Sequence, residues 1–238
     1  MEVIARRLYR KLLGALSGQL APATLRRWRS RVSVQWVIGV LALIAASGLF
    51  VAIAEDVVTG DPLTKMDLAV VQWFHAQTHP AITGWMRWVS DLHGVLAISL
   101  YVVLLAIYLL WKREWVWLAF LVGAAPGGMG LNEAMKHLFQ RARPSLDQAL
   151  LTLPSYSFPS GHVAGATLFY GVLAIMFIGA GDGCRRRAFV ASVAVALVAL
   201  SRLYLGVHYL SDVLAAFVEA GAWLALCLLG AQRHGRTT

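Results

Sequence analysis

Residues 201–212, SRLYLGVHYLSD, place an arginine, a histidine and an aspartate within an otherwise largely apolar part of the chain. If a helix begins just before His208, then His208 and Asp212 lie four residues apart on one face. The carboxylate can then bind one ring nitrogen and leave the other free to attack an electrophile. Arg202, upstream across the turn LYLGV, can bind an anion beside that nitrogen. The alternative is a purely structural ion pair between Arg202 and Asp212.

The composition around this stretch is that of a membrane protein. Of the 238 residues, 59% are hydrophobic and 14% are charged, which predicts a polytopic membrane protein of one compact bundle. The net charge of +9 does not indicate a nucleic-acid partner, because the basic residues lie mainly between apolar runs. We therefore expect a basic surface facing the membrane.

The apolar runs predict six membrane spans, at about 34–54, 93–110, 115–139, 161–180, 188–205 and 209–230. A backbone in lipid must satisfy its own hydrogen bonds, so these runs should be helices and the fold all-α. Residues 57–91 contain too many charges to span. Their apolar residues recur at helical spacing around Pro80, which predicts two short amphipathic helices on the membrane surface. The predicted membrane domain covers 33–232.

The two ends of the chain are expected outside the bilayer. Residues 1–32 alternate apolar and basic positions and predict an interfacial helix, broken near Pro22, with a solvated basic tail as the alternative. They do not have the pattern of a signal peptide. Residues 233–238 form a short tail. Cys184 in a predicted loop and Cys227 in a predicted span do not indicate a disulfide.

A second polar cluster lies at the end of the third predicted span. Lys136 and Arg143 are seven residues apart, two helical turns, so both can face one point. Pro144 restricts Arg143 and stops the helix. The alternative is that Lys136 only pairs with Glu133, three residues before it.

A third cluster, Pro159-Ser160-Gly161-His162, opens the fourth predicted span. Backbone amides at a helix N-terminus bind anions, and Gly161 permits a close approach. Ser160 can cap the helix or donate to the anion, and His162 can protonate a leaving group. A capped helix with an incidental histidine is the alternative.

Together the clusters predict phosphoryl transfer without a metal or another cofactor. Lys136, Arg143 and Arg202 can neutralise the equatorial oxygens, while one histidine attacks in line and the other protonates the departing oxygen. A metal site would need clustered carboxylates, and the spans contain few.

The three clusters resemble the signatures of the type 2 phosphatidic acid phosphatase superfamily, K-x6-RP, PSGH and SR-x5-H-x3-D, and all three occur in order. The resemblance implies that His208 is the nucleophile that becomes phosphohistidine and that Asp212 orients it. It implies that His162 is the general acid and then assists the attack of water. The residues implied to hold the phosphate are Lys136, Arg143, Ser160, Gly161 and Arg202.

The resemblance also implies a membrane lipid phosphatase acting on phosphatidylglycerol phosphate, phosphatidic acid or a polyprenyl diphosphate such as undecaprenyl diphosphate. A lipid phosphotransferase using the same histidine is an alternative. A non-enzymatic lipid-headgroup binder or transporter is another, although binding needs no nucleophile. The family's soluble vanadium-dependent haloperoxidases are excluded by the six predicted spans.

The charge pattern predicts the orientation in a bacterial inner membrane. With both termini in the cytoplasm, most basic residues fall on the inner side, including the N-terminal segment, 112–113 and 185–187. All three signatures then lie at outer ends of spans. We therefore expect an active site that faces the periplasm or exterior.

Overall fold

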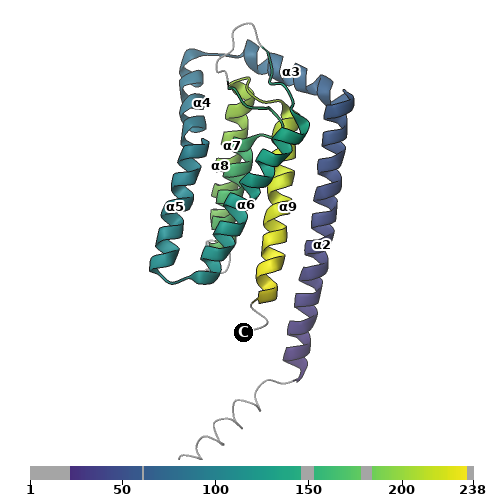
Figure 1. Ribbon diagram of the computed structural model, residues 1–238, viewed down its shortest axis with the longest axis vertical. Helices are drawn as coiled ribbons and strands as arrows, with labels where there is room; N and C mark the ends of the chain where they lie inside the picture. Colours follow the sequence, from purple (N-terminus) through teal and green to yellow (C-terminus); the bar gives the residue numbers. More distant parts are fainter. Residues whose placement is uncertain (1–21, 61, 146–152, 178–183, 235–238) are drawn as a thin grey trace, which may run out of the picture. The chain divides into compact units, whose positions relative to one another are not determined.

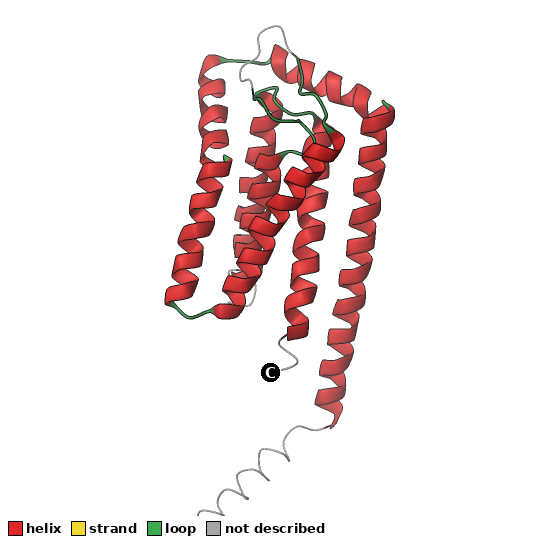
Figure 2. Cartoon of the chain, viewed as in Figure 1, coloured by secondary structure: helices red, strands yellow, loops and turns green. Residues whose placement is uncertain are grey.

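The computed structural model describes residues 22–60, 62–145, 153–177 and 184–234. Every regular element within them is a helix, as Figure 2 shows, which confirms the all-α prediction. The helices are α2 (Pro22–Thr59), α3 (Pro62–Ala76), α4 (Pro80–Leu92), α5 (Val95–Trp111), α6 (Trp115–Phe139), α7 (Gly161–Phe177), α8 (Cys184–Tyr204) and α9 (Leu210–His234). The chain divides into two units, 1–41 and 42–238. The site lies wholly in the second.

The predictions for the chain ends fall largely outside the described residues. Residues 1–21 and 235–238 are not described. Helix α2 begins at Pro22, a position where the missing amide of proline causes no loss. The basic run 26–31 therefore lies within α2. The first span was predicted to end at Ala54, but α2 continues to Thr59 and ends at Gly60, whose φ of +79° favours glycine.

Helix α7 is packed against α6, α8 and α9 in the centre of the second unit (Figure 1). Its side chains Val163, Ala166 and Val172 are completely buried. Helix α6 runs unbroken through Pro126, and the glycines beside it allow close packing. A Cβ atom on Gly128 would lie 2.7 Å from Leu168 Cδ1 and 2.9 Å from Trp223 Cδ1, so any larger residue there would require these side chains to move.

Two helices, α3 and α4, occupy the segment predicted to hold a pair of amphipathic helices. The helical conformation is interrupted between them at residues 77–79. His79 caps α4, because its Nδ1 accepts a hydrogen bond from Ala81 N. Helix α4 continues into α5 with a bend of 43°, and the pair is apolar enough to be one broken span. The placement of these helices on the membrane surface stays a prediction.

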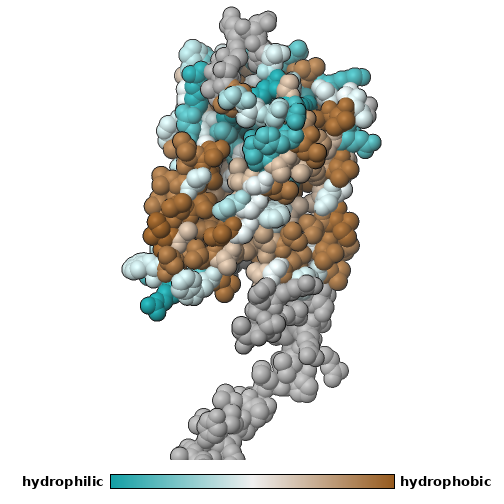
Figure 3. All heavy atoms as spheres, viewed as in Figure 1, coloured by the Kyte–Doolittle hydropathy of each residue, from teal (hydrophilic) through white to brown (hydrophobic). Residues whose placement is uncertain are grey.

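The predicted count of six spans is not confirmed. Residues 36–59, 185–204 and 210–231 are long and apolar enough to cross a membrane, and the bent pair α4–α5 adds a fourth candidate. Helix α7 is apolar but has only 17 residues, and α6 carries polar residues in its second half. Figure 3 shows apolar side chains over much of the helical surface and polar ones gathered at the end where α3 and α4 begin. These features are those of a membrane protein.

Candidate active site

The three polar clusters meet at one end of the bundle. Helices α6 and α8 end there, and α7 and α9 begin there (Figure 1). Arg143 Nη1 lies 3.1 Å from His208 Nε2, and a Cβ atom on Gly161, the residue before His162, would lie 3.2 Å from Lys136 Nζ. Signature residues that are separated by up to 76 positions in the chain therefore share one site.

His208 lies in the turn before α9. The sequence allowed a helix that begins just before it, with a span from about residue 209, and α9 begins at Leu210. Asp212 explains this start, because its Oδ2 accepts a hydrogen bond from Tyr209 N at 2.9 Å and so caps the helix from its third residue. The separation of four positions still brings His208 Nδ1 to 3.3 Å from Asp212 Oδ2.

The neighbours of the His208 ring fix its tautomer. Arg143 Nη1 lies 3.1 Å from Nε2, and a guanidinium can only donate, so Nε2 must be the acceptor. The ring proton is then on Nδ1 and faces Asp212. The lone pair of Nε2 therefore faces Arg143, the cation that would bind a phosphate at this position.

The surroundings of the His208 ring favour its uncharged form. Burial, which the effect of Asp212 opposes, and the charges of Arg202 and Arg143 together lower its pKa to about 4. The ring is only 1% exposed. A neutral imidazole that is already oriented by a carboxylate is in the form required of a nucleophile.

Arg143 is hydrogen-bonded to the loop before α7 and to the turn before α9. Its Nε donates to Ser155 O at 2.7 Å, its Nη1 to Val207 O at 2.7 Å and its Nη2 to Tyr156 O at 3.1 Å. Burial lowers the pKa of this guanidinium, and the Asp212 charge opposes that effect. The guanidinium thus stays beside His208 Nε2 without a bound ligand.

Asp212 pairs with Arg141, and the alternative ion pair with Arg202 is not formed among the described residues. Arg141 Nη1 lies 2.6 Å from Asp212 Oδ1. Ser157 Oγ donates to Asp212 Oδ2 in a short hydrogen bond. Arg202 instead donates through Nη1 to Ser90 Oγ, on α4, also in a short bond. Its side chain is therefore not tied to the carboxylate.

Donors with no partner are available for an oxyanion. Arg202 and Ser160 are completely buried. Within the described residues, Arg202 Nε and Nη2 and Ser160 Oγ have no hydrogen-bond partner. Buried donors are rarely left unpaired, so these atoms fit a ligand with several acceptor oxygens.

Gly161, the first residue of α7, is approached closely by α6. A Cβ atom there would lie 3.2 Å from Lys136 Nζ and 3.4 Å from Asn132 Oδ1. The missing side chain thus lets the ammonium group reach the helix N-terminus, where amide groups already favour an anion. The predicted Lys136–Glu133 pair exists, but at 3.9 Å, and Glu133 lies closer to the exposed His137, at 3.2 Å.

A polar pair supports this cluster from the bundle interior. Asn132 Nδ2 donates to Glu219 Oε2 at 2.9 Å, and both residues are buried. The hydrogen bond to Glu219 fixes the amide of Asn132, whose Oδ1 lies beside Gly161.

His162 lies in the first turn of α7, half-buried, toward the break between α4 and α5. A Cβ atom on Gly94 would be 3.7 Å from its Nε2. The His162 ring therefore lies at van der Waals distance from Gly94. This position places His162 between the cations and the bend of α4 and α5.

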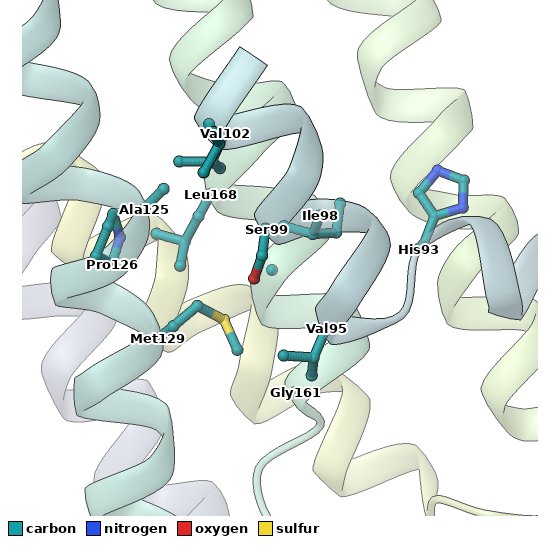
Figure 4. A pocket seen from close by; sticks show the side chains of 12 residues that line it. His93, Val95, Ile98, Ser99, Val102, Ala125, Pro126, Met129, Gly161 and Leu168 are labelled. Atoms are coloured by element: carbon teal, nitrogen blue, oxygen red, sulfur yellow. The ribbon is translucent and has the colours of Figure 1, made fainter. Parts of the chain in front are cut away.

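An apolar pocket leads away from this end of the site, between α5, α6 and α7. Figure 4 shows Ile98, Met129 and Leu168 around it, with Gly161 at one edge. Because Gly161 also contacts the Lys136 region, the pocket adjoins the cationic cluster. The arrangement can take a phosphate and a hydrocarbon chain together.

Sequence reasoning missed three residues of the site: Asp67, Arg141 and Ser157. Asp67 is on α3 and completely buried, and its carboxylate lies 2.8 Å from Arg141 Nη2. Arg141 lies between Lys136 and Arg143 in the sequence, so its basic character was visible, but its partners were not. No local pattern marked Asp67 or Ser157.

Comparison with known proteins decides the family. Residues 114–236, which contain all three clusters, match the PAP2 superfamily. The chain belongs to the PAP2 superfamily. This confirms the resemblance drawn from the three signatures, and the matched residues include the site of His208, His162 and Lys136.

This PAP2 chain is similar to proteins of two bacteria. It is 36% identical over 91 residues to phosphatidylglycerophosphatase B of Bacillus subtilis strain 168, a match that covers 37% of the chain and only 44% of that relative. A crystal structure of a transmembrane PAP2-type phosphatidylglycerolphosphate phosphatase from Bacillus subtilis aligns with a TM-score of 0.71 at 24% identity, over 81% of this chain and 96% of the other. Aquifex aeolicus LpxE aligns with a TM-score of 0.55 at 24% identity, over 68% and 94%. These two structures establish the fold.

A metal ion in this PAP2 chain would require a cluster of side chains that could bind it. Within the ranges that the structure covers, no group of three or more His, Cys, Asp or Glu side chains is arranged to hold a metal ion. Metal-independent chemistry stays a prediction, tested below.

Proposed function

We propose that this chain is an integral-membrane lipid phosphatase that hydrolyses a phosphomonoester or diphosphate of a lipid through a phosphohistidine on His208. The observation that carries the proposal is the geometry of the His208 ring. Its Nδ1 is oriented by Asp212, and its unprotonated Nε2 lies beside Arg143. Family membership and the adjoining apolar pocket support a lipid phosphate as the substrate.

The reaction follows from these positions in two balanced steps. His208 Nε2 forms a bond to phosphorus while the P–O bond to the leaving group breaks, and His162 gives its proton to the departing oxygen. Water then attacks phosphorus, the N–P bond breaks, and His162 takes the proton of the water. Lys136, Arg143 and Arg202, with Ser160 and the amides at Gly161, stabilise the phosphoryl oxygens in both steps.

The substrate is tested with a panel of lipid phosphates in detergent. The name of the Bacillus subtilis relative makes phosphatidylglycerol phosphate the first candidate, with phosphatidic acid and a polyprenyl diphosphate beside it. We expect phosphate release from at least one of them and much slower release from a water-soluble phosphate of the same headgroup. No release from any of them would contradict the proposal, and transfer of the phosphoryl group to an added lipid alcohol instead of water would favour the phosphotransferase alternative.

We predict that activity survives metal removal. Three fixed cations and a helix N-terminus take the part that metal ions have in other phosphoryl transfers, so kcat after chelation should stay within about twofold of the untreated enzyme. Vanadate should inhibit, because it adopts the trigonal-bipyramidal geometry of the transferring group. The measurement is phosphate release with and without EDTA. An absolute need for added Mg²⁺ would count against the site described above.

The active site is proposed to face the periplasm or exterior, and thiol labelling tests this. In a chain with Cys184→Ser and Cys227→Ser, Pro154→Cys should react with an impermeant maleimide in intact spheroplasts, and Arg186→Cys should react only after lysis. Residues 154 and 186 are both exposed, so accessibility in the folded chain does not bias the comparison. Labelling of Arg186→Cys but not Pro154→Cys in intact cells would reverse the orientation.

A further inference from the structure

Asp67 is a buried carboxylate that no signature contains. It lies on α3, and its side chain is 0% exposed. Its Oδ1 accepts a hydrogen bond from Ser211 N at 2.8 Å, and its Oδ2 accepts from Ser211 Oγ at 2.5 Å. Both donors belong to the residue next to Asp212. A helix far away in the sequence thus holds the start of α9.

Arg141 connects Asp67 to the nucleophile pair. Its Nη2 donates to Asp67 Oδ2 at 2.8 Å, and its Nη1 donates to Asp212 Oδ1 at 2.6 Å. The guanidinium carbon also lies 4.2 Å from the centre of the Tyr209 ring, which restricts it further. Since Arg141 occupies Oδ1 of Asp212, the other oxygen is the one turned to His208.

The second carboxylate, Asp67, changes the net charge of the group formed by Asp67, Arg141 and Asp212. Arg141 stays protonated, because although burial lowers its pKa, Asp212 and Asp67 together raise it above the usual value. A single guanidinium would neutralise Asp212 and weaken its attraction for a cationic ring. With Asp67 added, the three groups carry one net negative charge, which favours the positive charge that develops on His208 when it bonds to phosphorus.

We propose that Asp67 and Arg141 are positioning residues for the His208–Asp212 pair, so that α3 forms part of the active site. The proposal rests on the phosphohistidine chemistry proposed above. The competing explanation is that the same contacts only dock α3 onto the bundle. The two differ in what they predict for turnover compared with phosphate binding, since Asp67 and Arg141 are not among the residues that hold the phosphate.

The first test is Asp67→Asn, which keeps the shape of the side chain and removes its charge. We expect kcat for the lipid phosphate to fall about 10- to 100-fold, as for outer partners of other functional imidazoles. KM and the vanadate inhibition constant should stay within about threefold, because the phosphate ligands are intact. Met66→Ala is the matched control, since Met66 is the preceding residue of α3 and 54% exposed. It should behave as the wild type.

The second test is a double-mutant cycle with Arg141→Lys, which retains the charge but cannot bridge two carboxylates. If Asp67 acts through Arg141, the double variant should have the kcat of the slower single variant, whereas independent effects multiply. If Asp67→Asn does not fold, Arg141→Lys tests the proposal by itself, because we expect this variant to lose kcat to a similar extent. A wild-type kcat in Arg141→Lys, multiplied losses in the cycle, or a parallel loss of vanadate binding and thermal stability would each overturn the inference.

His208→Ala, measured in the same assay, separates this inference from the proposed function. Turnover that survives in His208→Ala would refute the phosphohistidine mechanism itself. An inactive His208→Ala together with a fully active, folded Asp67→Asn would refute only the role given to α3.

Discussion

His208→Ala should lower kcat for the lipid phosphate by about 10⁴-fold or more, the scale seen when a covalent nucleophile is removed. No neighbouring group can replace the attacking nitrogen. Arg143, which contacts it, is a cation, and the Asp212 carboxylate is already occupied by Arg141, Ser157 and Tyr209. Asp212→Asn should give a large but smaller loss, because the ring loses its orientation and the stabilisation of its charge.

The measurement combines turnover with a trap for the intermediate. Wild-type enzyme mixed with labelled lipid phosphate and quenched in alkali, where an N–P bond survives, should carry label on protein, and His208→Ala should carry none. Vanadate binding checks that the phosphate site of the variant is intact. A folded His208→Ala enzyme with near-normal turnover, or with label on another residue, would contradict the assignment.

The signature residues could be predicted because their chemistry depends on short, fixed spacings. His208 and Asp212, four residues apart, meet even though α9 begins only at Leu210. Lys136 and Arg143 are seven residues apart, but the helix does not reach Pro144 as predicted: α6 ends at Phe139, and Arg143 lies in the loop that follows. The apolar runs likewise predicted most helices, because burial in lipid or protein selects them directly.

What escaped prediction depends on contacts between distant segments. Asp67 meets Ser211 across 144 positions, and the residues around it in α3 have the ordinary pattern of an amphipathic helix. Nothing local distinguishes it from a surface carboxylate. The end of α2 escaped for a related reason, since Glu55 and Asp56 look like a span boundary but are compatible with further helix turns.

The second large effect is expected at His162, whose role is separable from that of His208. If His162 protonates the leaving oxygen, His162→Asn should lower kcat for a lipid phosphate by about 10²- to 10⁴-fold, the usual range for general acid catalysis. An aryl phosphate has a leaving group that departs without a proton, so the first step should be largely restored with it. His137→Asn is the matched control, because His137 is 67% exposed and pairs only with Glu133 among charged groups in the described part of the chain.

His162 is also expected to act in the second step of the reaction, the hydrolysis of the phosphohistidine. It should take the proton of the attacking water, and a better leaving group does nothing for that step. His162→Asn given an aryl phosphate should therefore release a burst of the aryl alcohol and then stall, with phosphohistidine accumulating on His208. Rapid-quench measurement of the alcohol and of alkali-stable label on protein tests both halves together. A steady-state rate equal to wild type, or a loss of equal size with lipid and aryl substrates and no burst, would show that His162 is not the proton donor to the leaving group.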